Sequence, residues 1–333
     1  MATAPAARAT NVPLPREQLL RAYRTMKTIR EFEERLHVEI QTGEIPGFTH
    51  LYAGQEAVAV GVCEHLSDRD YIVSTHRGHG HCLAKGCDVQ GMMYEIYGRA
   101  AGLCKGKGGS MHIADVTKGM LGANAIVGGG PPLAVGAAIA CRNRRDGTVS
   151  VAFGGDGSAN QGTVFEAMNM AVVLKVPALF VFENNGYSEH TGADYAVGSR
   201  DIAGRAHGFG MPAEKCDGAD FFAVYEAFGR LCAHARAGGG PATLEPVITR
   251  YYGHFEGDPQ LYRAKDEVKR LRETMDCLKN FRARVEGEGW LKASELDPID
   301  EQVLAEIDVA VKNARAAPPA PESEVTTDVY ATY

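Results

Sequence analysis

The feature that most constrains the fold is a strand–helix–strand pattern between residues 148 and 183. Residues 148–153 form an apolar run of strand length, and residues 163–174 carry apolar side chains on one face of a predicted helix. A second apolar run, residues 178–182, follows Pro177. A strand, a helix and a strand in this order predict a βαβ unit with parallel strands and a right-handed crossover. The sequence therefore predicts an α/β fold whose parallel sheet is flanked by helices.

Polar motifs follow both strands of this unit. Gly155-Asp156-Gly157 comes after the first strand, and Asn184-Asn185 comes after the second. Open α/β sheets bind ligands beyond the carboxyl ends of their strands, so Asp156 and Asn185 are expected to converge there. A carboxylate and an amide oxygen are hard ligands, suited to magnesium shared with a diphosphate. Either motif alone is more often a turn or loop than a metal site. The two motifs together, at the ends of successive strands, indicate a metal site much more specifically.

Further helices and strands extend this unit. Apolar residues recur every three or four positions between residues 19 and 36, which predicts an amphipathic helix at the start of the fold. Residues 71–74 and 246–251 are short apolar runs that we expect to be strands. Residues 266–284 and 296–316 predict helices near the end of the sequence.

Glycine is dense between residues 98 and 136, where we expect a long, ordered and functional loop. No internal repeat or linker is visible, which favours a single domain. The expected organisation is a disordered tail over residues 1–14, an α/β domain with N- and C-terminal helical extensions over residues 15–316, and a Pro-rich, extended or mobile tail over residues 317–333.

Composition excludes several classes of function. The chain has 35 Lys and Arg against 42 Asp and Glu, a net charge of -7, and no basic run. Nucleic-acid and membrane-surface binding need clustered positive charge, so neither is expected. No apolar stretch reaches the roughly 18 residues of a membrane span, and the start lacks the features of a secretory signal. The eight cysteines are scattered without metal-site spacing, which favours reduced, buried thiols in a cytoplasmic protein.

The two polar motifs and their spacing resemble a known signature. Twenty-six residues separate Gly157 from Asn184. Thiamine diphosphate enzymes have the same signature, in which GDG is followed by about 26 residues and then by NN. From about Tyr23 to Tyr330 the chain resembles the alpha subunits of the 2-oxo acid dehydrogenase family, and a thiamine diphosphate-binding fold is implied. The stretches that carry this resemblance are FTHLYAGQEA, THRGHG, GKGGSMH and DGSANQG.

A narrower likeness lies within that family. MLGANAIVG, RYYGHFEGDPQ and TDVY resemble its acetoin-cleaving branch. The alternative is a pyruvate or branched-chain 2-oxo acid dehydrogenase alpha subunit. A nicotinamide-dependent oxidoreductase would need a GxGxxG motif after a strand, and the GDG loop has the wrong spacing. A non-catalytic scaffold is disfavoured because Asp156, Asn185 and His254 are all present.

The resemblance implies a role for each matching residue around the diphosphate. The side chains of Asp156 and Asn185, with the Tyr187 backbone carbonyl, would bind Mg²⁺. Gly157 and Ser158 would add backbone contacts to the same group.

Four further residues are implied to bind the cofactor. His76 and Arg77 would face the diphosphate oxygens, where a guanidinium fork suits phosphate geometry. Ala125 and Val127 would contact the aminopyrimidine ring through their backbones.

Three histidines, His50, His79 and His254, are implied to line the substrate side and to take part in catalysis. Plain alternatives exist for several of these residues. His76, His79 and His81 could be solvated loop histidines. Arg77 could be an ordinary surface charge, and His50 could be a satisfied core residue. Glu183 is interpreted as a structural carboxylate at a strand end. The sequence GLCKGKGGS superficially suggests a phosphate loop but lacks the required spacing.

The resemblance also implies partners. The cofactor needs a carboxylic acid against its aminopyrimidine ring, and we find no second α/β domain that would supply one. A beta subunit is implied to donate this glutamate in an α2β2 heterotetramer. The two-carbon unit cleaved from a small-molecule substrate would pass to a lipoyl-bearing acyltransferase or to an artificial oxidant.

Overall fold

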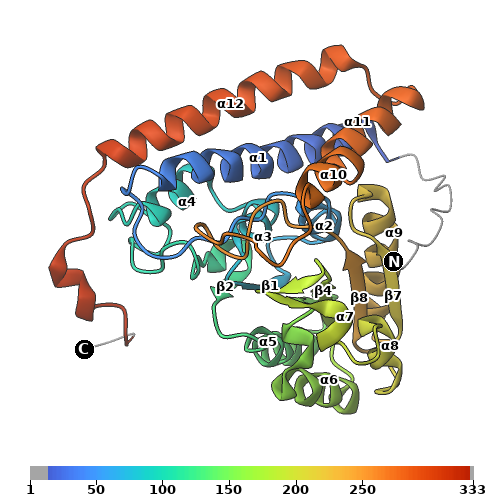
Figure 1. The fold of residues 1–333 in the computed structure, drawn as a ribbon. Coiled ribbons are helices and arrows are strands. Elements are labelled where there is room, and N and C mark those ends of the chain that lie inside the picture. The colour runs from blue at the N-terminus through green and yellow to red at the C-terminus, as the bar shows by residue number, and fades with distance from the viewer. Residues whose placement is uncertain (1–13, 331–333) are drawn as a thin grey trace.

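A parallel sheet forms the centre of the computed structural model, which describes residues 14–330 (Figure 1). Its strands are β1 (Tyr71–Thr75), β2 (Met120–Asn124), β3 (Ser150–Gly155), β4 (Ala178–Glu183), β7 (Ala213–Asp217) and β8 (Ala242–Val247). They lie in the order β2-β1-β3-β4-β8-β7, and every neighbouring pair is parallel. A two-stranded antiparallel ribbon, β5 (Tyr187–Ser188) and β6 (Thr191–Gly192), follows β4. The predicted α/β class with a parallel sheet is confirmed.

The predicted βαβ unit is present and sets the register of the site. Helix α6 (Gly162–Leu174) connects β3 to β4, and these strands pair directly, with Gly155 opposite Glu183. Both strands are almost entirely buried, as expected for a central parallel pair covered on both faces. The residues that follow them therefore leave the sheet side by side.

Helices cover both faces of the sheet. Helix α5 (Gly130–Arg144) and α6 pack on one face, where they share a core with Phe180 and Phe182. Helices α1 (Arg16–Ile40), α2 (Glu56–Cys63) and α9 (Phe221–Arg236) belong to the core on the other face, with Leu179 and Val181. Successive side chains of a strand point to opposite faces, so β4 feeds both cores. The remaining helices are α3 (His79–Ala84), α4 (Val89–Ile96), α7 (Ala193–Ala196), α8 (Ile202–His207), α10 (Glu267–Thr274), α11 (Cys277–Gly287) and α12 (Ala293–Ala316).

The amphipathic helix expected near the N-terminus is α1, and α12 packs alongside it (Figure 1). Val303, Ile307 and Val311 form the buried stripe of α12. Because the apolar positions recur at helical spacing, both helices were visible in the sequence.

Three predicted elements are wrong in their bounds. The 98–136 segment is not one loop, because it contains β2, which pairs with β1, and the start of α5. The strand expected over residues 246–251 is β8, which ends at Val247 after pairing with β4 and β7. The helix expected over residues 266–284 is two helices, because Asp276 accepts backbone amides and caps a new start at Cys277.

The two predicted tails differ in what the structure describes. Residues 1–13, most of the predicted N-terminal tail, lie outside the described residues, and Leu14 is buried. The described part of the C-terminal tail pairs with the glycine-rich segment: the Ala100 amide donates to the Pro318 carbonyl, and Lys105 forms an ion pair with Asp328 at 2.9 Å.

All eight cysteines are unpaired and seven are buried. Among the described residues, no helix combines the length and apolar character needed to cross a membrane.

Candidate active site

A cavity of about 260 Å³ opens at the carboxyl ends of β1, β2, β3 and β4. Its lining comes from the segments that follow these strands, from the first residues of α5, and from the segments before α2, before β2 and after β8. This location includes the point where the chain switches direction across the sheet, between β1 and β3, which is where open α/β sheets bind ligands. The N-terminus of α5 adds a positive dipole end that favours an anion, although Pro131 and Pro132 offer no backbone N–H there. Every predicted site residue except His79 lines this cavity.

Asp156 and Asn185 follow the ends of the adjacent strands β3 and β4, and both line the cavity. The Oδ2 atom of Asp156 is buried and has no hydrogen-bond partner among the described residues. Burial raises the pKa of this carboxyl to about 6. The Asn185 amide donates to Oε1 of Gln55 at 3.1 Å, which orients the side chain. A buried oxygen without a donor is satisfied by a cation, so these residues fit Mg²⁺.

The glycine turn after β3 brings the backbone close to neighbouring segments. A Cβ on Gly157 would lie 2.0 Å from Oγ of Ser188, so only glycine fits beside the β5–β6 ribbon. Ser158 ties this turn together, because its hydroxyl accepts from the Gly155 amide at 2.8 Å and donates to the Gly155 carbonyl at 2.9 Å. The turn is thus held in one shape with its backbone exposed to the cavity, which suits a diphosphate.

Arg77 lies in the cavity wall with its guanidinium bonded to the protein backbone. Its Nη1 donates to the Leu51 carbonyl at 2.6 Å and its Nη2 to the His254 carbonyl at 2.8 Å. Burial, with the nearby Arg250 cation, lowers the pKa of Arg77 to about 9. Arg77 lines the cavity, which is compatible with its predicted position beside the cofactor. Its guanidinium stays positively charged at neutral pH.

Arg250 was missed in the sequence. It is buried in the cavity wall after β8, where Nη1 donates to the Tyr187 carbonyl at 2.8 Å and Nη2 to the Glu189 carbonyl at 2.9 Å. Its Nη2 also donates to the Tyr262 hydroxyl at 2.6 Å, and its Nε is buried without a partner among the described residues. Its position just after β8, a strand that pairs with β4, could have identified it as a candidate site residue. The predicted strand over residues 246–251 hid this, because it placed Arg250 inside the strand.

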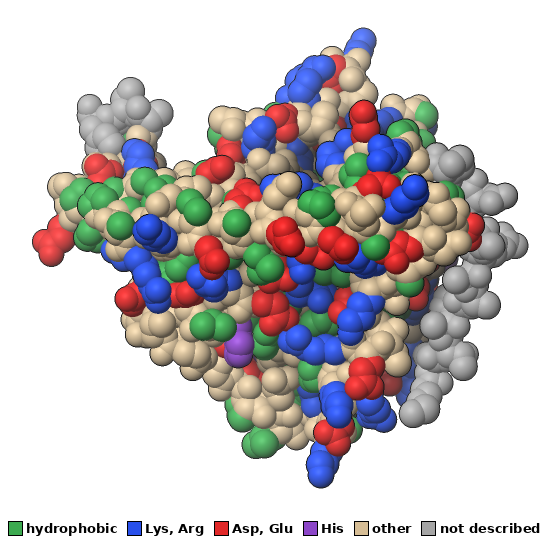
Figure 2. All heavy atoms as spheres, turned by 90° about the horizontal axis from the view of Figure 1, so that it is seen from above, with side chains coloured by type: hydrophobic (Ala, Val, Ile, Leu, Met, Phe, Trp, Pro, Cys, Tyr) green, Lys and Arg blue, Asp and Glu red, His purple; other side chains and the backbone are tan. Residues whose placement is uncertain are grey.

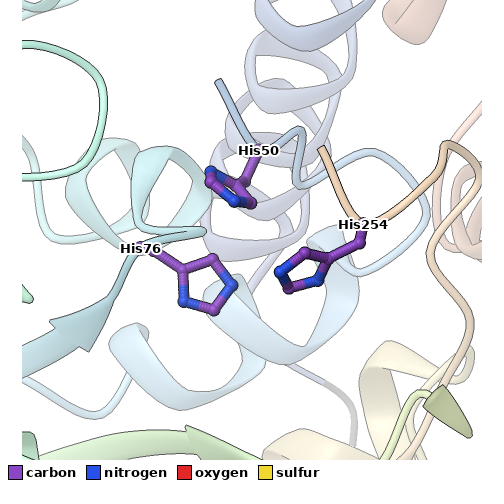
Figure 3. A group of neighbouring side chains, drawn as sticks. All are labelled: His50, His76 and His254. Atoms are coloured by element: carbon purple, nitrogen blue, oxygen red, sulfur yellow. The ribbon is translucent and has the colours of Figure 1, made fainter. Parts of the chain in front are cut away.

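Three histidine rings converge in the cavity, and Figure 3 shows them facing one another from three segments. The ring centroids of His50 and His76 lie 4.5 Å apart, and those of His50 and His254 lie 5.0 Å apart. Burial and the Arg77 charge lower the pKa of His50 to about 3, of His76 to about 2 and of His254 to about 4. All three imidazoles are therefore neutral at neutral pH, and each keeps a nitrogen lone pair that can accept a hydrogen bond or bind a cation.

The structure does not bring His79 into the cavity. Its ring is fully buried, with Nδ1 at 3.0 Å from Oε1 of Glu33 and Nε2 at 2.9 Å from Oγ of Ser110. Since both ring nitrogens are engaged, the solvated-loop alternative is also wrong. His79 instead joins α1 to the segment that carries Met111, a residue of the cavity lining.

Glu183 lies at the end of β4, as interpreted from the sequence, and it also lines the cavity. Its Oε1 accepts from the Tyr52 hydroxyl and lies 3.2 Å from Nε2 of His81. His81 Nδ1 lies 2.7 Å from Oγ of Ser74, so a buried polar chain runs behind the cavity.

The candidate phosphate loop in the glycine-rich segment is occupied by an internal anion. Glu95 is fully buried, and its two carboxylate oxygens accept four backbone amides, from residues 104, 106, 108 and 109, at 2.7 to 3.0 Å. Because a protein carboxylate fills this nest, the loop is a structural element that supports Ser110 and the cavity-lining Met111.

Comparisons with known proteins identify the family of this chain. The dehydrogenase E1 component family matches residues 24–323. The chain is 55% identical over 323 residues to the alpha subunit of acetoin:2,6-dichlorophenolindophenol oxidoreductase of Cupriavidus necator, covering 97% of each chain. It is 51% identical over 320 residues to the protein of the same name from Bacillus subtilis, covering 96% of each. It is 43% identical over 315 residues to the pyruvate dehydrogenase E1 component subunit alpha of Zymomonas mobilis, covering 94% of this chain and 89% of that protein.

Proposed function

The chain belongs to the dehydrogenase E1 component family, and on this premise we propose that it is the alpha subunit of a thiamine diphosphate-dependent enzyme that oxidatively cleaves acetoin. The family likeness expected from the sequence motifs is confirmed. The observation that carries the site assignment is the unpartnered, buried Asp156 oxygen beside Asn185 at two adjacent strand ends. Similarity to the two acetoin oxidoreductase alpha subunits supports acetoin as substrate.

Asp156 and Asn185 would hold Mg²⁺ against the diphosphate. The Tyr187 carbonyl, proposed as the third protein ligand, already accepts a hydrogen bond from Arg250, and its second lone pair remains for the metal. The Gly157 and Ser158 backbone lies in the same wall, and the cationic Arg77 and Arg250 add positive charge that suits a diphosphate.

Thiamine diphosphate, when bound, supplies a thiazolium carbon that adds to a carbonyl and accepts the electrons released on carbon–carbon cleavage. Ala125 and Val127, which line the cavity, would contact its aminopyrimidine ring through the backbone. His50 and His254 are the proposed proton-transfer residues, since both rings line the cavity and the negative charge of a bound diphosphate would favour their protonated form. The Nδ1 atom of His50 has no partner among the described residues and is available for the transferred proton. His79, buried behind the cavity, would act as a positioning residue.

A beta subunit would complete the site. Among the described cavity-lining residues the carboxylates are Asp156, Glu183 and Glu189, and none belongs to the segment expected to meet the aminopyrimidine. In that segment Ile126 is 73% exposed and Val127 is 50% exposed, an unusual state for large apolar side chains beside a cavity. A partner chain that covers them and contributes a glutamate would account for both observations. A lipoyl-bearing acyltransferase as acceptor and a cytoplasmic location remain predictions.

A 2-oxo acid such as pyruvate is the second candidate substrate. The charges of Arg77 and Arg250 near the histidines suit a carboxylate, which acetoin lacks. The pyruvate dehydrogenase alpha subunit from Zymomonas mobilis is also similar to this chain.

An oxidation assay separates these candidates. The chain is co-expressed with its beta subunit and supplied with thiamine diphosphate, Mg²⁺ and an artificial electron acceptor, and acetoin is compared with pyruvate. A higher kcat/KM for acetoin supports the proposal, and a higher value for pyruvate replaces the substrate while keeping the site.

An Asp156→Asn variant tests the site itself. It is expected to lose Mg²⁺-dependent cofactor binding, measured by calorimetry, while an exposed Asp194→Asn variant on α7 retains it. Undiminished binding by Asp156→Asn would contradict the site assignment. Turnover by the purified chain without any partner would contradict the need for a beta subunit.

A further inference from the structure

The histidine cluster has the composition of a metal site that differs from the magnesium site. His50, His76 and His254 each offer one ring nitrogen, and these three atoms all lie within 4.8 Å of one another. They come from the segment before α2, the end of β1 and the segment after β8, so the fold rather than a local motif brings them together (Figure 3).

The three rings are free to act as ligands. His50 is only 8% exposed, and its Nδ1 is buried with no hydrogen-bond partner in residues 14–330. Within the described residues, neither His76 nor His254 uses a ring nitrogen in a hydrogen bond, in contrast to His79, whose two nitrogens are both engaged. A buried nitrogen without a partner, such as the His50 Nδ1, is costly in a protein interior, and a bound metal would satisfy it.

We propose that His50, His76 and His254 bind a divalent transition metal such as Zn²⁺, and that this ion blocks the substrate side of the cavity. Three imidazoles with an open fourth position match the coordination of Zn²⁺. The hard oxygen ligands Asp156 and Asn185 select Mg²⁺ instead, so one cavity offers two sites with different metal preference.

Small movements complete the coordination sphere. Tetrahedral Zn–N bonds of about 2.0–2.1 Å place the nitrogens about 3.4 Å apart, closer than the upper limit of 4.8 Å seen here. His76 and His254 are only partly buried, so their side chains can rotate inward.

Nearby charge sets the character of the site. Arg77 and Arg250 lie close enough to perturb all three rings electrostatically, and they oppose a dication. An anionic fourth ligand such as hydroxide or chloride reduces this repulsion. In the part of the chain that the structure describes, no carboxylate or carbonyl accepts a hydrogen bond from these rings, so we infer a weak, exchangeable site rather than a permanent structural one. Occupation would remove the proton-accepting nitrogens from catalysis.

Cobalt substitution tests the proposal without relying on turnover. The chain, purified with its partner subunit and freed of metals, is titrated with Co²⁺ in excess Mg²⁺, and the visible absorption of four-coordinate Co²⁺ is recorded. We expect one such Co²⁺ per chain, displaced by Zn²⁺ and not by Mg²⁺. The variants His50→Gln, His76→Gln and His254→Gln should each lower the affinity at least about tenfold, because each removes one of three ligands.

Two matched variants give the result its meaning. His207→Gln removes an exposed histidine at the end of α8, and Asp156→Asn alters the magnesium site; both should retain the cobalt spectrum. Size-exclusion chromatography checks that each variant still assembles. Absence of four-coordinate Co²⁺ in the unaltered protein, or unchanged affinity in the three cluster variants, would overturn the proposal. So would loss of the spectrum in Asp156→Asn, since the metal would then lie at the oxygen site.

Discussion

The guanidinium of Arg250 donates from Nη1 to the backbone carbonyl of Tyr187, 2.8 Å away. The same guanidinium holds the Glu189 carbonyl and the Tyr262 hydroxyl. Arg250 thus fixes the turn that follows Asn185, although it belongs to a segment some 60 residues later in the chain. Its function is to keep the proposed magnesium ligands in place while it adds charge to the cavity wall.

Replacing Arg250 with lysine should therefore weaken cofactor binding. Lysine keeps the charge but lacks the planar fork that reaches three acceptors at once. We expect Mg²⁺-dependent affinity for thiamine diphosphate, measured by calorimetry on the assembled enzyme, to fall about tenfold or more. An Arg270→Lys change on the exposed face of α10 is the control. Equal affinity in both variants would show that charge alone suffices.

The nest around Glu95 gives a prediction about stability. Its carboxylate accepts four buried backbone amides, and the Gln amide group of a Glu95→Gln variant would place donors against two of them. Unsatisfied buried amides should lower the free energy of unfolding by about 1–3 kcal/mol. Urea denaturation measures this loss, and faster hydrogen exchange in residues 104–109 locates it.

The control for this change is Glu301→Gln, which alters an exposed carboxylate on α12. It should leave the unfolding free energy within about 0.5 kcal/mol of the original. If Glu95→Gln behaves in the same way, the four amides do not depend on the negative charge.

Asp70 should make stability dependent on acid pH. Burial alone would raise the pKa of this carboxyl, but two hydrogen bonds from Arg236 and backbone amides of Ser67 and Val149 outweigh it, so the pKa lies below its ordinary value of 3.8. A carboxyl with a lowered pKa contributes stability that is complete above the unfolded value and is lost as pH falls through the folded one.

An Asp70→Asn variant isolates this contribution. The unaltered protein should be about 1–3 kcal/mol more stable than the variant near pH 7, and the difference should shrink as the pH falls below about 4. Urea denaturation of both proteins at several pH values measures the difference. A difference that stays constant down to about pH 3 would contradict the assignment to Asp70 ionisation.

The central part of the fold was predictable because it depends on local pattern. Two buried strands joined by an amphipathic helix predicted the β3–α6–β4 unit, and adjacency of parallel strand ends then placed Asp156 beside Asn185. The sequence pattern predicts the next strand of the sheet, β8, several residues later than the structure shows it. The buried residues of β8 begin at Ala242, shortly after three consecutive glycines. Glycine-rich sequence is typical of loops, so little in the sequence indicates that a strand begins there.

The parts that were missed depend on contacts between distant segments. His79 looked like its neighbours in the sequence, and only the approach of Glu33 on α1 and Ser110 made it a core residue. Met120–Asn124 was taken for loop because glycine and polar residues weaken its strand pattern, and pairing with β1 overrides that weakness. Arg250 contacts Tyr187 only after the chain has crossed the sheet.

The close approach of Gly157 to Ser188 gives the sharpest test of the diphosphate turn. A Cβ at position 157 would lie 2.0 Å from the Ser188 Oγ, 2.6 Å from its Cβ and 3.6 Å from its Cα. A Gly157→Ala variant should therefore displace the β5–β6 ribbon and reduce cofactor affinity about tenfold or more, because a contact under 3.0 Å forces a shift.

Additional substitutions at Ser188 test whether the Gly157→Ala effect comes from the contact with Ser188. Adding Ser188→Ala to Gly157→Ala should not restore cofactor affinity, because the Ser188 Cβ that clashes at 2.6 Å remains. Adding Ser188→Gly removes that atom and leaves only the Cα at 3.6 Å, so affinity should recover substantially. Calorimetric titration with thiamine diphosphate and Mg²⁺ compares the three variants. Equal affinity of the two double variants would mean that the added methyl group acts on the bound diphosphate rather than on the ribbon.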